Sequence, residues 1–210
     1  MRQSYALLGP PSVLLIATLL VSSCSLGRSS PPPRLYTLTA MARADGNPHA
    51  AGTQNLAIGV GPVELPHYVD RPQIVTGDSG NELQQASLAQ WAEPLDTNFA
   101  RVLTLNLALL LATDRVAVFP WQGPVPLDYQ VVIEVTQFVG TPGGSVTLAA
   151  LWRVLGKEGR EPLMSRQSIL TDTTDAQEYS ALAAAMSRTV ASLSREIATA
   201  LTALAPNPLP

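Results

Sequence analysis

The fold is decided by residues 129–173, which run YQVVIEVTQFV (129–139), GTPGG (140–144), S145, VTLAALWRVL (146–155), GKEGREP (156–162) and LMSRQSILTDT (163–173). The three long segments are rich in Val, Ile, Thr and aromatic residues, which favour strands. The glycine-containing runs 140–144 and 156–162 predict turns. With residues 115–119, which have a similar composition, they predict four sequential strands joined as an antiparallel meander.

Further strands are predicted upstream of this region. Residues 34–39 and 55–63 alternate apolar with small or polar side chains, and Pro62 and Pro66 are expected to end the second ladder because proline donates no backbone hydrogen bond. Residues 73–76 and 82–89 flank the sequence Gly-Asp-Ser-Gly-Asn at 77–81, which predicts a hairpin turn.

Residues 94–112 predict the first long helix. Pro94 suits the first helical position, and Glu93 and Asp96 place negative charge at the positive end of the helix dipole. Apolar residues occupy most of its circumference, so we expect burial against a sheet on one side and a second cover on the other. That cover could come from the same domain or from another subunit.

Residues 175–204 predict a second helix. Thr174 and Gln177 have the spacing of a capping box. One apolar stripe recurs at intervals of three and four residues, and it consists of Leu182, Met186, Val190, Leu193, Ile197, Leu201 and Leu204. The predicted fold class is α/β in the α+β sense, a single domain of residues 34–204 with two helices on a mixed, mostly antiparallel sheet. Residues 205–210 are expected to be a disordered tail.

The amino end has the pattern of a lipoprotein signal. Residues 1–23 carry one positive charge and an apolar stretch that is too short to span a bilayer. They end in Val21-Ser22-Ser23 before Cys24, which resembles the lipobox of bacterial lipoproteins. The resemblance implies that residues 1–23 are cleaved, that Cys24 is lipidated, and, because serine follows it, that the anchor lies in the outer membrane and faces the periplasm. Residues 24–33 would form the anchor and a tether that reaches about 30 Å.

Composition excludes several classes of function. The 210 residues include 13 Lys and Arg against 16 Asp and Glu, with no basic stripe, so we expect no nucleic-acid partner. One cysteine and two histidines leave almost no material for a metal site. We see no nucleophile with a base, no phosphate-binding loop and no paired carboxylates outside a helix start. We therefore expect no enzyme activity, no metal and no cofactor.

Two further segments carry a family resemblance. They are GPVELPHYVDRPQIVT (61–76) and WAEPLDTNFARVL (91–103). Both resemble the auxiliary lipoproteins of ABC-type envelope transport systems, of the paraquat-inducible protein C type, and the similarity extends from about residue 34 to residue 201. The resemblance implies an accessory, non-catalytic role beside mammalian-cell-entry (MCE) domain proteins, which move phospholipid or other hydrophobic molecules between membranes. The lipoprotein would dock or stabilise the periplasmic transport protein at the outer membrane.

Five residues in these two segments are candidates for partner binding, because aromatic residues and arginine dominate protein interfaces. They are Tyr68, Asp70, Arg71, Trp91 and Arg101. Two of them also have purely structural explanations, since Trp91 could cover the first helical turn and Arg101 could pair with Glu93 or Asp96. The incompletely covered first helix further predicts a homo-oligomer.

A rival hypothesis is a periplasmic lipoprotein that itself holds a lipid or another hydrophobic molecule between its helices and its sheet. Lipid extracted from the purified protein would distinguish it from a docking component.

Overall fold

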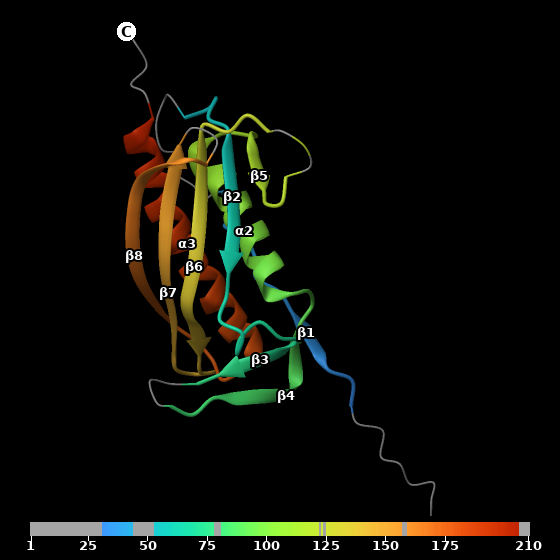
Figure 1. Ribbon diagram of the computed structural model, residues 1–210. Coiled ribbons are helices and arrows are strands. Elements are labelled where there is room, and N and C mark those ends of the chain that lie inside the picture. The colour runs from blue at the N-terminus through green and yellow to red at the C-terminus, as the bar shows by residue number, and fades with distance from the viewer. Residues whose placement is uncertain are drawn as a thin grey trace, which may run out of the picture. The chain divides into compact units, whose positions relative to one another are not determined.

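Two sheets and two helices form the described part of the chain, which in this computed structural model is residues 31–43, 53–77, 81–121, 123, 125–156 and 159–205 (Figure 1). The strands are β1 (Arg34–Tyr36), β2 (Ile58–Glu64), β3 (Gln73–Thr76), β4 (Gln84–Trp91), β5 (Val116–Val118), β6 (Tyr129–Gly140), β7 (Ser145–Gly156) and β8 (Glu161–Thr173). The helices are α2 (Leu95–Leu111) and α3 (Tyr179–Leu204). The α+β fold class predicted from the sequence is confirmed.

The larger sheet has the strand order β5-β2-β6-β7-β8, and both helices cover the same face of it (Figure 1). Strands β6, β7 and β8 form the predicted antiparallel meander. The prediction that residues 115–119 belong to this meander is wrong, because β5 pairs with β2 in parallel and β2 pairs in parallel with β6.

A crossing over β2 explains the misplaced strand. A Cβ atom at Gly59 would lie only 2.6 Å from side-chain carbons of Trp121 and Leu127, so the chain between β5 and β6 passes directly over this glycine. The glycine therefore permits the chain to leave β5 at one edge of β2 and begin β6 at the other.

Strand β2 does not end at Pro62. The register shifts between Val60 and Val63, where Gly61 has a φ of 113°, and the strand then continues to Glu64. A bulge thus accommodates the residue that lacks an N–H group, whereas we expected the ladder to stop there.

A separate small sheet, which the sequence did not indicate, has the order β1-β4-β3. Its antiparallel β3–β4 hairpin confirms the predicted pairing, and β1 adds to β4 in parallel. The small sheet lies at the end of the domain opposite to the end of α3 (Figure 1).

Helix α2 begins one residue later than predicted. Pro94 is its N-cap residue, and Ala112, with a left-handed φ of 50°, ends it. The second cover that we expected is supplied largely within the domain, because α3 packs against α2 and Leu38 from the segment after β1 is 1% exposed. Leu105, at 48% exposure, remains on the surface.

Buried asparagines hold the segment after β1 against α2. Asn98 Oδ1 accepts a hydrogen bond from the backbone N–H of Leu38 at 2.7 Å, and Asn106 Oδ1 accepts one from Met41 at 2.8 Å. Asn106 also donates to Ser194 Oγ of α3 at 3.0 Å. These bonds satisfy an extended backbone that belongs to neither sheet.

Helix α3 begins at Tyr179, so the predicted start at residue 175 and the capping box are wrong. Thr174 instead closes the turn between β6 and β7, since its backbone N–H donates to Gly144 O at 2.9 Å and its hydroxyl donates to the same oxygen at 3.1 Å. Gln177 lies against Gly143 of that turn. Tertiary contacts with the turn therefore replace the local cap.

The apolar stripe of α3 is buried as predicted. Each of its first six residues is at most 2% exposed, and they are Leu182, Met186, Val190, Leu193, Ile197 and Leu201. Between the helices and the sheet, the rings of Phe99 and Phe138 pack edge to face with centroids 5.6 Å apart. The chain's own side chains thus fill this layer.

Several predictions fall outside the described residues. They include the signal peptide, Cys24, most of the tether and the tail beyond residue 205. None of the helices in the described ranges has the length and hydropathy needed to cross a membrane.

Candidate functional site

The two segments that carry the family resemblance meet in space. The backbone N–H of Trp91, the last residue of β4, donates to the carbonyl of Pro72 at 2.7 Å. Residues 70–72 therefore lie beside residues 91–94, which lead from β4 into α2. A contact between parts of the chain so far apart in sequence could not be inferred from either motif alone.

These two stretches wall a surface cavity of about 450 Å³. Its lining comprises Asp70, Arg71, Pro72, Trp91, Ala92, Glu93 and Pro94. Trp91 is 6% exposed and belongs to the hydrophobic core, so the cavity has a rigid aromatic wall. Pro72 and Pro94 are exposed at its rim.

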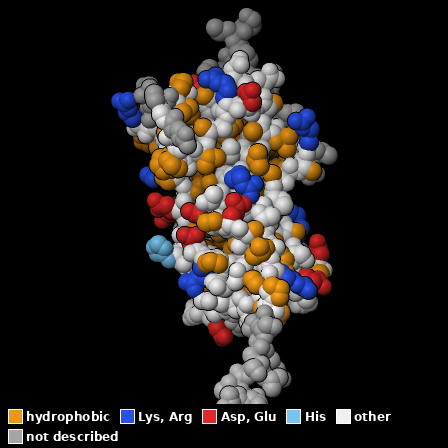
Figure 2. All heavy atoms as spheres, turned by 90° about the vertical axis from the view of Figure 1, so that its right-hand side faces the viewer, with side chains coloured by type: hydrophobic (Ala, Val, Ile, Leu, Met, Phe, Trp, Pro, Cys, Tyr) orange, Lys and Arg blue, Asp and Glu red, His pale blue; other side chains and the backbone are white. Residues whose placement is uncertain are grey.

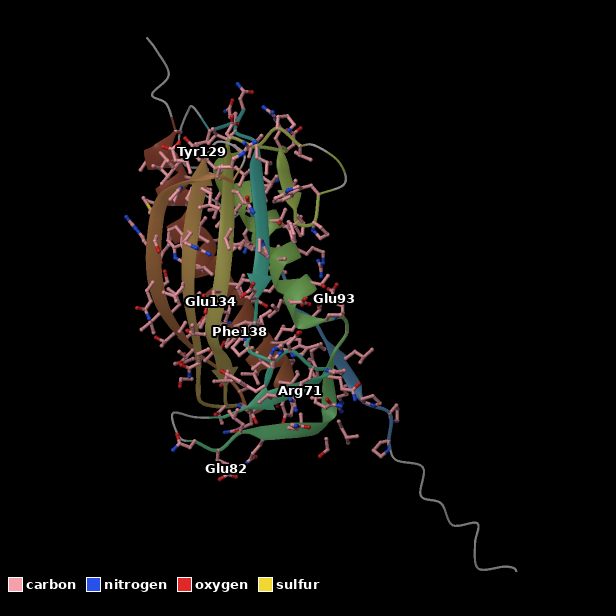
Figure 3. All side chains as sticks on the ribbon, viewed as in Figure 1. Arg71, Glu82, Glu93, Tyr129, Glu134 and Phe138 are labelled. Carbon is pink, nitrogen blue, oxygen red and sulfur yellow. The ribbon has the colours of Figure 1, made fainter. Side chains whose placement is uncertain are left out.

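Arg71 is the basic residue of this cavity. Its Nε atom is buried and has no hydrogen-bond partner among the described residues. A buried N–H group without a partner is costly, and an arginine fork is suited to carboxylate or carbonyl acceptors. Figure 3 shows Arg71 next to the small sheet and Glu93 next to the first turns of α2.

Tyr68 lies in the turn that leads into the cavity. Pro66 O accepts hydrogen bonds from the backbone N–H groups of Val69 at 3.0 Å and Asp70 at 3.2 Å, which fixes the turn. The Tyr68 ring packs against the core, and burial raises the pKa of its phenol above the ordinary value. His67 of the same turn is exposed.

Arg101 and Glu93 form an ion pair beside the cavity. The pair is partly exposed, with 47% exposure for the Arg101 side chain, so it contributes little to stability. Asp96 lies in the first turn of α2, as expected for a negative charge at the positive end of the helix dipole, and its Oδ1 accepts a hydrogen bond from the backbone N–H of Thr97 at 2.5 Å. The N-cap residue, Pro94, has no side-chain capping hydrogen bond.

The structure thus places the five sequence candidates around one feature. Asp70, Arg71 and Trp91 line the cavity, Tyr68 is on the adjoining turn, and Arg101 is linked to the lining through Glu93. Whether they contact a partner stays a prediction. The Arg101–Glu93 pair is one of the structural explanations expected from the sequence. The place of Glu93 in the cavity lining was not expected, because it depends on the contact between Trp91 and Pro72.

A larger hollow of about 750 Å³ lies along the second half of α2. Leu105, Ala108 and Leu109 form its apolar part, and Arg43 and Asp114 lie at its border. Figure 2 shows the corresponding side of the molecule, where hydrophobic side chains are present in both the upper and the lower parts. The hollow lies on the portion of α2 that the domain leaves uncovered.

Within the part of the chain that the structure describes, no three His, Cys, Asp or Glu side chains are grouped so that they could hold a metal ion. The lining of the cavity offers hydrogen bonding, ion pairing and apolar contact, which are the elements of a recognition site.

Comparison with known families agrees with this arrangement. Residues 36–198 match the family described as the ABC-type transport auxiliary lipoprotein component. The chain belongs to this family. Its matched region includes both motif segments, the cavity and most of α3, so the resemblance seen in the sequence is confirmed.

Two solved structures share the fold of this auxiliary lipoprotein. Protein XCC0632 from Xanthomonas campestris, a member of the DUF330 family, is 20% identical with a TM-score of 0.66, over 81% of this chain and 97% of that one. A crystal structure of an uncharacterized protein is 22% identical with a TM-score of 0.65, over 81% of this chain and 99% of that one. No curated protein matches this auxiliary lipoprotein.

Proposed function

We propose that this auxiliary lipoprotein is anchored in the outer membrane through Cys24 and docks the MCE-domain protein of an envelope lipid transport system. Membership of the transport auxiliary lipoprotein family over residues 36–198 is the observation that carries the proposal. The membrane, the partner and the docking role come from the lipobox pattern and from the resemblance stated for the two motif segments.

The proposed lipid anchor is supported by the sequence around Cys24. Cys24 is the one cysteine in the chain and follows Val21-Ser22-Ser23, as acylation of a mature amino-terminal cysteine would require. More than one acyl chain is needed for stable attachment, and bacterial lipoprotein anchors supply it. Ser25 favours the outer membrane over the inner one.

The cavity at Arg71 and Trp91 is the proposed docking site. A buried aromatic wall, an arginine with a free buried N–H and a polar rim are typical of the centre of an interface. Arg71 would bind a carbonyl or carboxylate of the MCE protein, and Trp91 with the prolines would hold an apolar side chain.

We propose that this role needs no catalysis. The acidic and histidine side chains near the cavity already have structural partners or lie in solvent, since Glu93 pairs with Arg101, Asp96 lies in the first turn of α2, and Asp70 and His67 are exposed. A docking site needs only complementary groups that stay in place.

The rival hypothesis, lipid held between the helices and the sheet, has less support. Phe99, Phe138 and Leu103 are fully buried in that layer and fill it. A lipid would have to displace core side chains that contribute to stability.

Co-isolation from membranes tests the docking proposal. We expect wild-type protein to capture an MCE-domain protein and the double variant Tyr68→Ala, Arg71→Ala to lose most of it. The matched control is Ser165→Ala, Arg166→Ala on the exposed edge strand β8. Equal capture by all three proteins would remove the cavity from the interface.

We also propose self-association into a closed oligomer, because Leu105 of α2 remains 48% exposed beside the larger hollow. Matched copies would present several docking sites to a ring-forming partner. Light scattering over a wide dilution series tests this, and a monomeric mass at high concentration would contradict it.

A further inference from the structure

The outer face of the small sheet is unusually apolar for an exposed surface. Leu35 of β1 is 63% exposed, Leu83 before β4 is 44% exposed and Leu88 of β4 is 43% exposed. The three strands of this sheet carry a single charged side chain, Arg34. Exposed sheets usually bear charges that keep them from associating.

The register shows that two of the leucines share one face. Leu35 pairs with Gln90, and Tyr36 pairs with Trp91. Because side chains alternate along a strand, Leu35 lies on the face of Gln90 and Leu88, opposite to the buried side of Trp91. Leu35 and Leu88 therefore point away from the core of the domain, and Leu83 is exposed just before β4.

The covalent chain brings this face close to the anchor. Arg34, the first residue of β1, is ten residues after Cys24 in the sequence. Even a fully extended tether of that length spans only about 35 Å. A lipid-anchored domain on such a short tether meets the membrane at a high effective concentration, and it does so beginning at β1.

We propose that the outer face of the small sheet lies on the membrane that holds the Cys24 anchor. Leu35, Leu83 and Leu88 enter the boundary between headgroups and acyl chains, and Arg34 binds lipid phosphates. Figure 2 shows hydrophobic side chains together with basic and acidic ones in the lower part of the molecule, on the side that carries β1.

Such contact would orient the docking site. Strand β4 carries Leu88 and ends at Trp91, which lines the Arg71 cavity. With the small sheet on the bilayer, the cavity is held at a fixed height above it, and the carboxyl end of α3, at the opposite end of the domain, points away from the membrane (Figure 1). This inference rests on the proposed lipid anchor, which the experiment therefore measures separately.

A single added cysteine provides a specific probe, because Cys24 is the one native cysteine and its sulfur would be acylated. We would label Ser87→Cys, the exposed neighbour of Leu88 in the irregular part of β4, or Thr199→Cys on α3 as the control, with an environment-sensitive fluorophore. Both positions are exposed. The full lipidated protein is reconstituted into vesicles of phosphatidylethanolamine and phosphatidylglycerol with brominated acyl chains.

We expect the label at residue 87 to be quenched several-fold more than the label at residue 199, with a blue-shifted emission. Leu35→Ser together with Leu88→Ser should reduce that quenching to the control level. The matched pair Leu151→Ser and Ile169→Ser, which changes exposed apolar residues of the large sheet, should leave it unchanged.

Vesicle flotation distinguishes the two possible failures. Protein that floats with the vesicles while residue 87 is quenched no more than residue 199 would overturn the inference and leave the anchor intact. Protein that does not float would overturn the anchor itself. A blue shift at residue 87 already present in detergent, or one that needs the MCE protein, would mean that a protein surface covers this face, and would also overturn the inference.

Discussion

Replacing Ser168 with alanine should destabilise the domain by leaving a buried donor without a partner. Trp152 is fully buried in β7, and its indole N–H donates to Ser168 Oγ at 2.9 Å. The Ser168 hydroxyl in turn donates to the carboxylate of Glu196 on α3. One hydroxyl therefore satisfies the tryptophan and links β8 to the helix.

The expected loss follows from the cost of an orphaned buried group. An unsatisfied buried N–H costs about 1–3 kcal/mol, so we expect Ser168→Ala to lower the free energy of unfolding by about 2 kcal/mol. For a domain of this size that corresponds to a decrease of roughly 4–8 °C in Tm. Ser165→Ala, at an exposed position of the same strand, should change stability by less than about 0.5 kcal/mol.

Urea denaturation followed by circular dichroism measures this loss without depending on Trp152 fluorescence. A double-mutant cycle isolates the hydrogen bond, because in a Trp152→Phe background no indole N–H remains to be orphaned. There, Ser168→Ala should cost less than in the wild-type background, because only the hydrogen bond to exposed Glu196 is lost. Equal effects in the two backgrounds, or equal effects of Ser168→Ala and Ser165→Ala, would refute the reasoning.

Three other perturbations have defined outcomes. Leu193→Ala should lower the free energy of unfolding by about 2–5 kcal/mol, since Leu193 is fully buried, whereas exposed Arg195→Ala should have almost no effect in the same denaturant titration. The hydrogen bond from Arg188 lowers the pKa of Asp172. The free energy of unfolding of wild type should therefore exceed that of Asp172→Asn by a constant amount above about pH 5, and this difference should disappear as the pH falls through the lowered pKa. A difference that does not change with pH would contradict this. Cys24→Ala should abolish lipid labelling and membrane fractionation, and its retention in the membrane pellet after a high-salt wash would disprove the anchor.

Local patterns were sufficient for most elements. The alternation and composition of residues 129–173 predicted β6, β7 and β8 with small errors at their ends. The stripe that contains Leu193 predicted the buried face of α3. These features depend on neighbours within one strand or one helical turn, which the sequence displays directly.

Long-range contacts account for the errors. The pairing of β5 with β2 depends on a chain crossing over Gly59, and the late start of α3 depends on Thr174 binding the turn at Gly144. The single predicted sheet is divided in two because β1 and β3 both pair with β4. No local propensity reveals such partners.

The sequence predicted which residues belong to the candidate site, but it did not predict that they lie around one cavity. Aromatic and arginine side chains in the two motif segments identified Asp70, Arg71 and Trp91, but their meeting around one cavity depends on the hydrogen bond between Trp91 and Pro72. The burial of the Arg71 Nε without a hydrogen-bond partner is a property of the tertiary structure that no sequence pattern indicates.

Photo-cross-linking from the cavity tests the docking role most directly. A photoreactive residue is introduced at Ala92, an exposed position in the cavity wall, or at exposed Thr199 on α3, in the full lipidated protein in its native membranes. Adducts are then isolated and their proteins identified. We predict that an MCE-domain protein is captured from position 92 and not from position 199. No such adduct from position 92, or equal capture from both positions, would contradict the docking role.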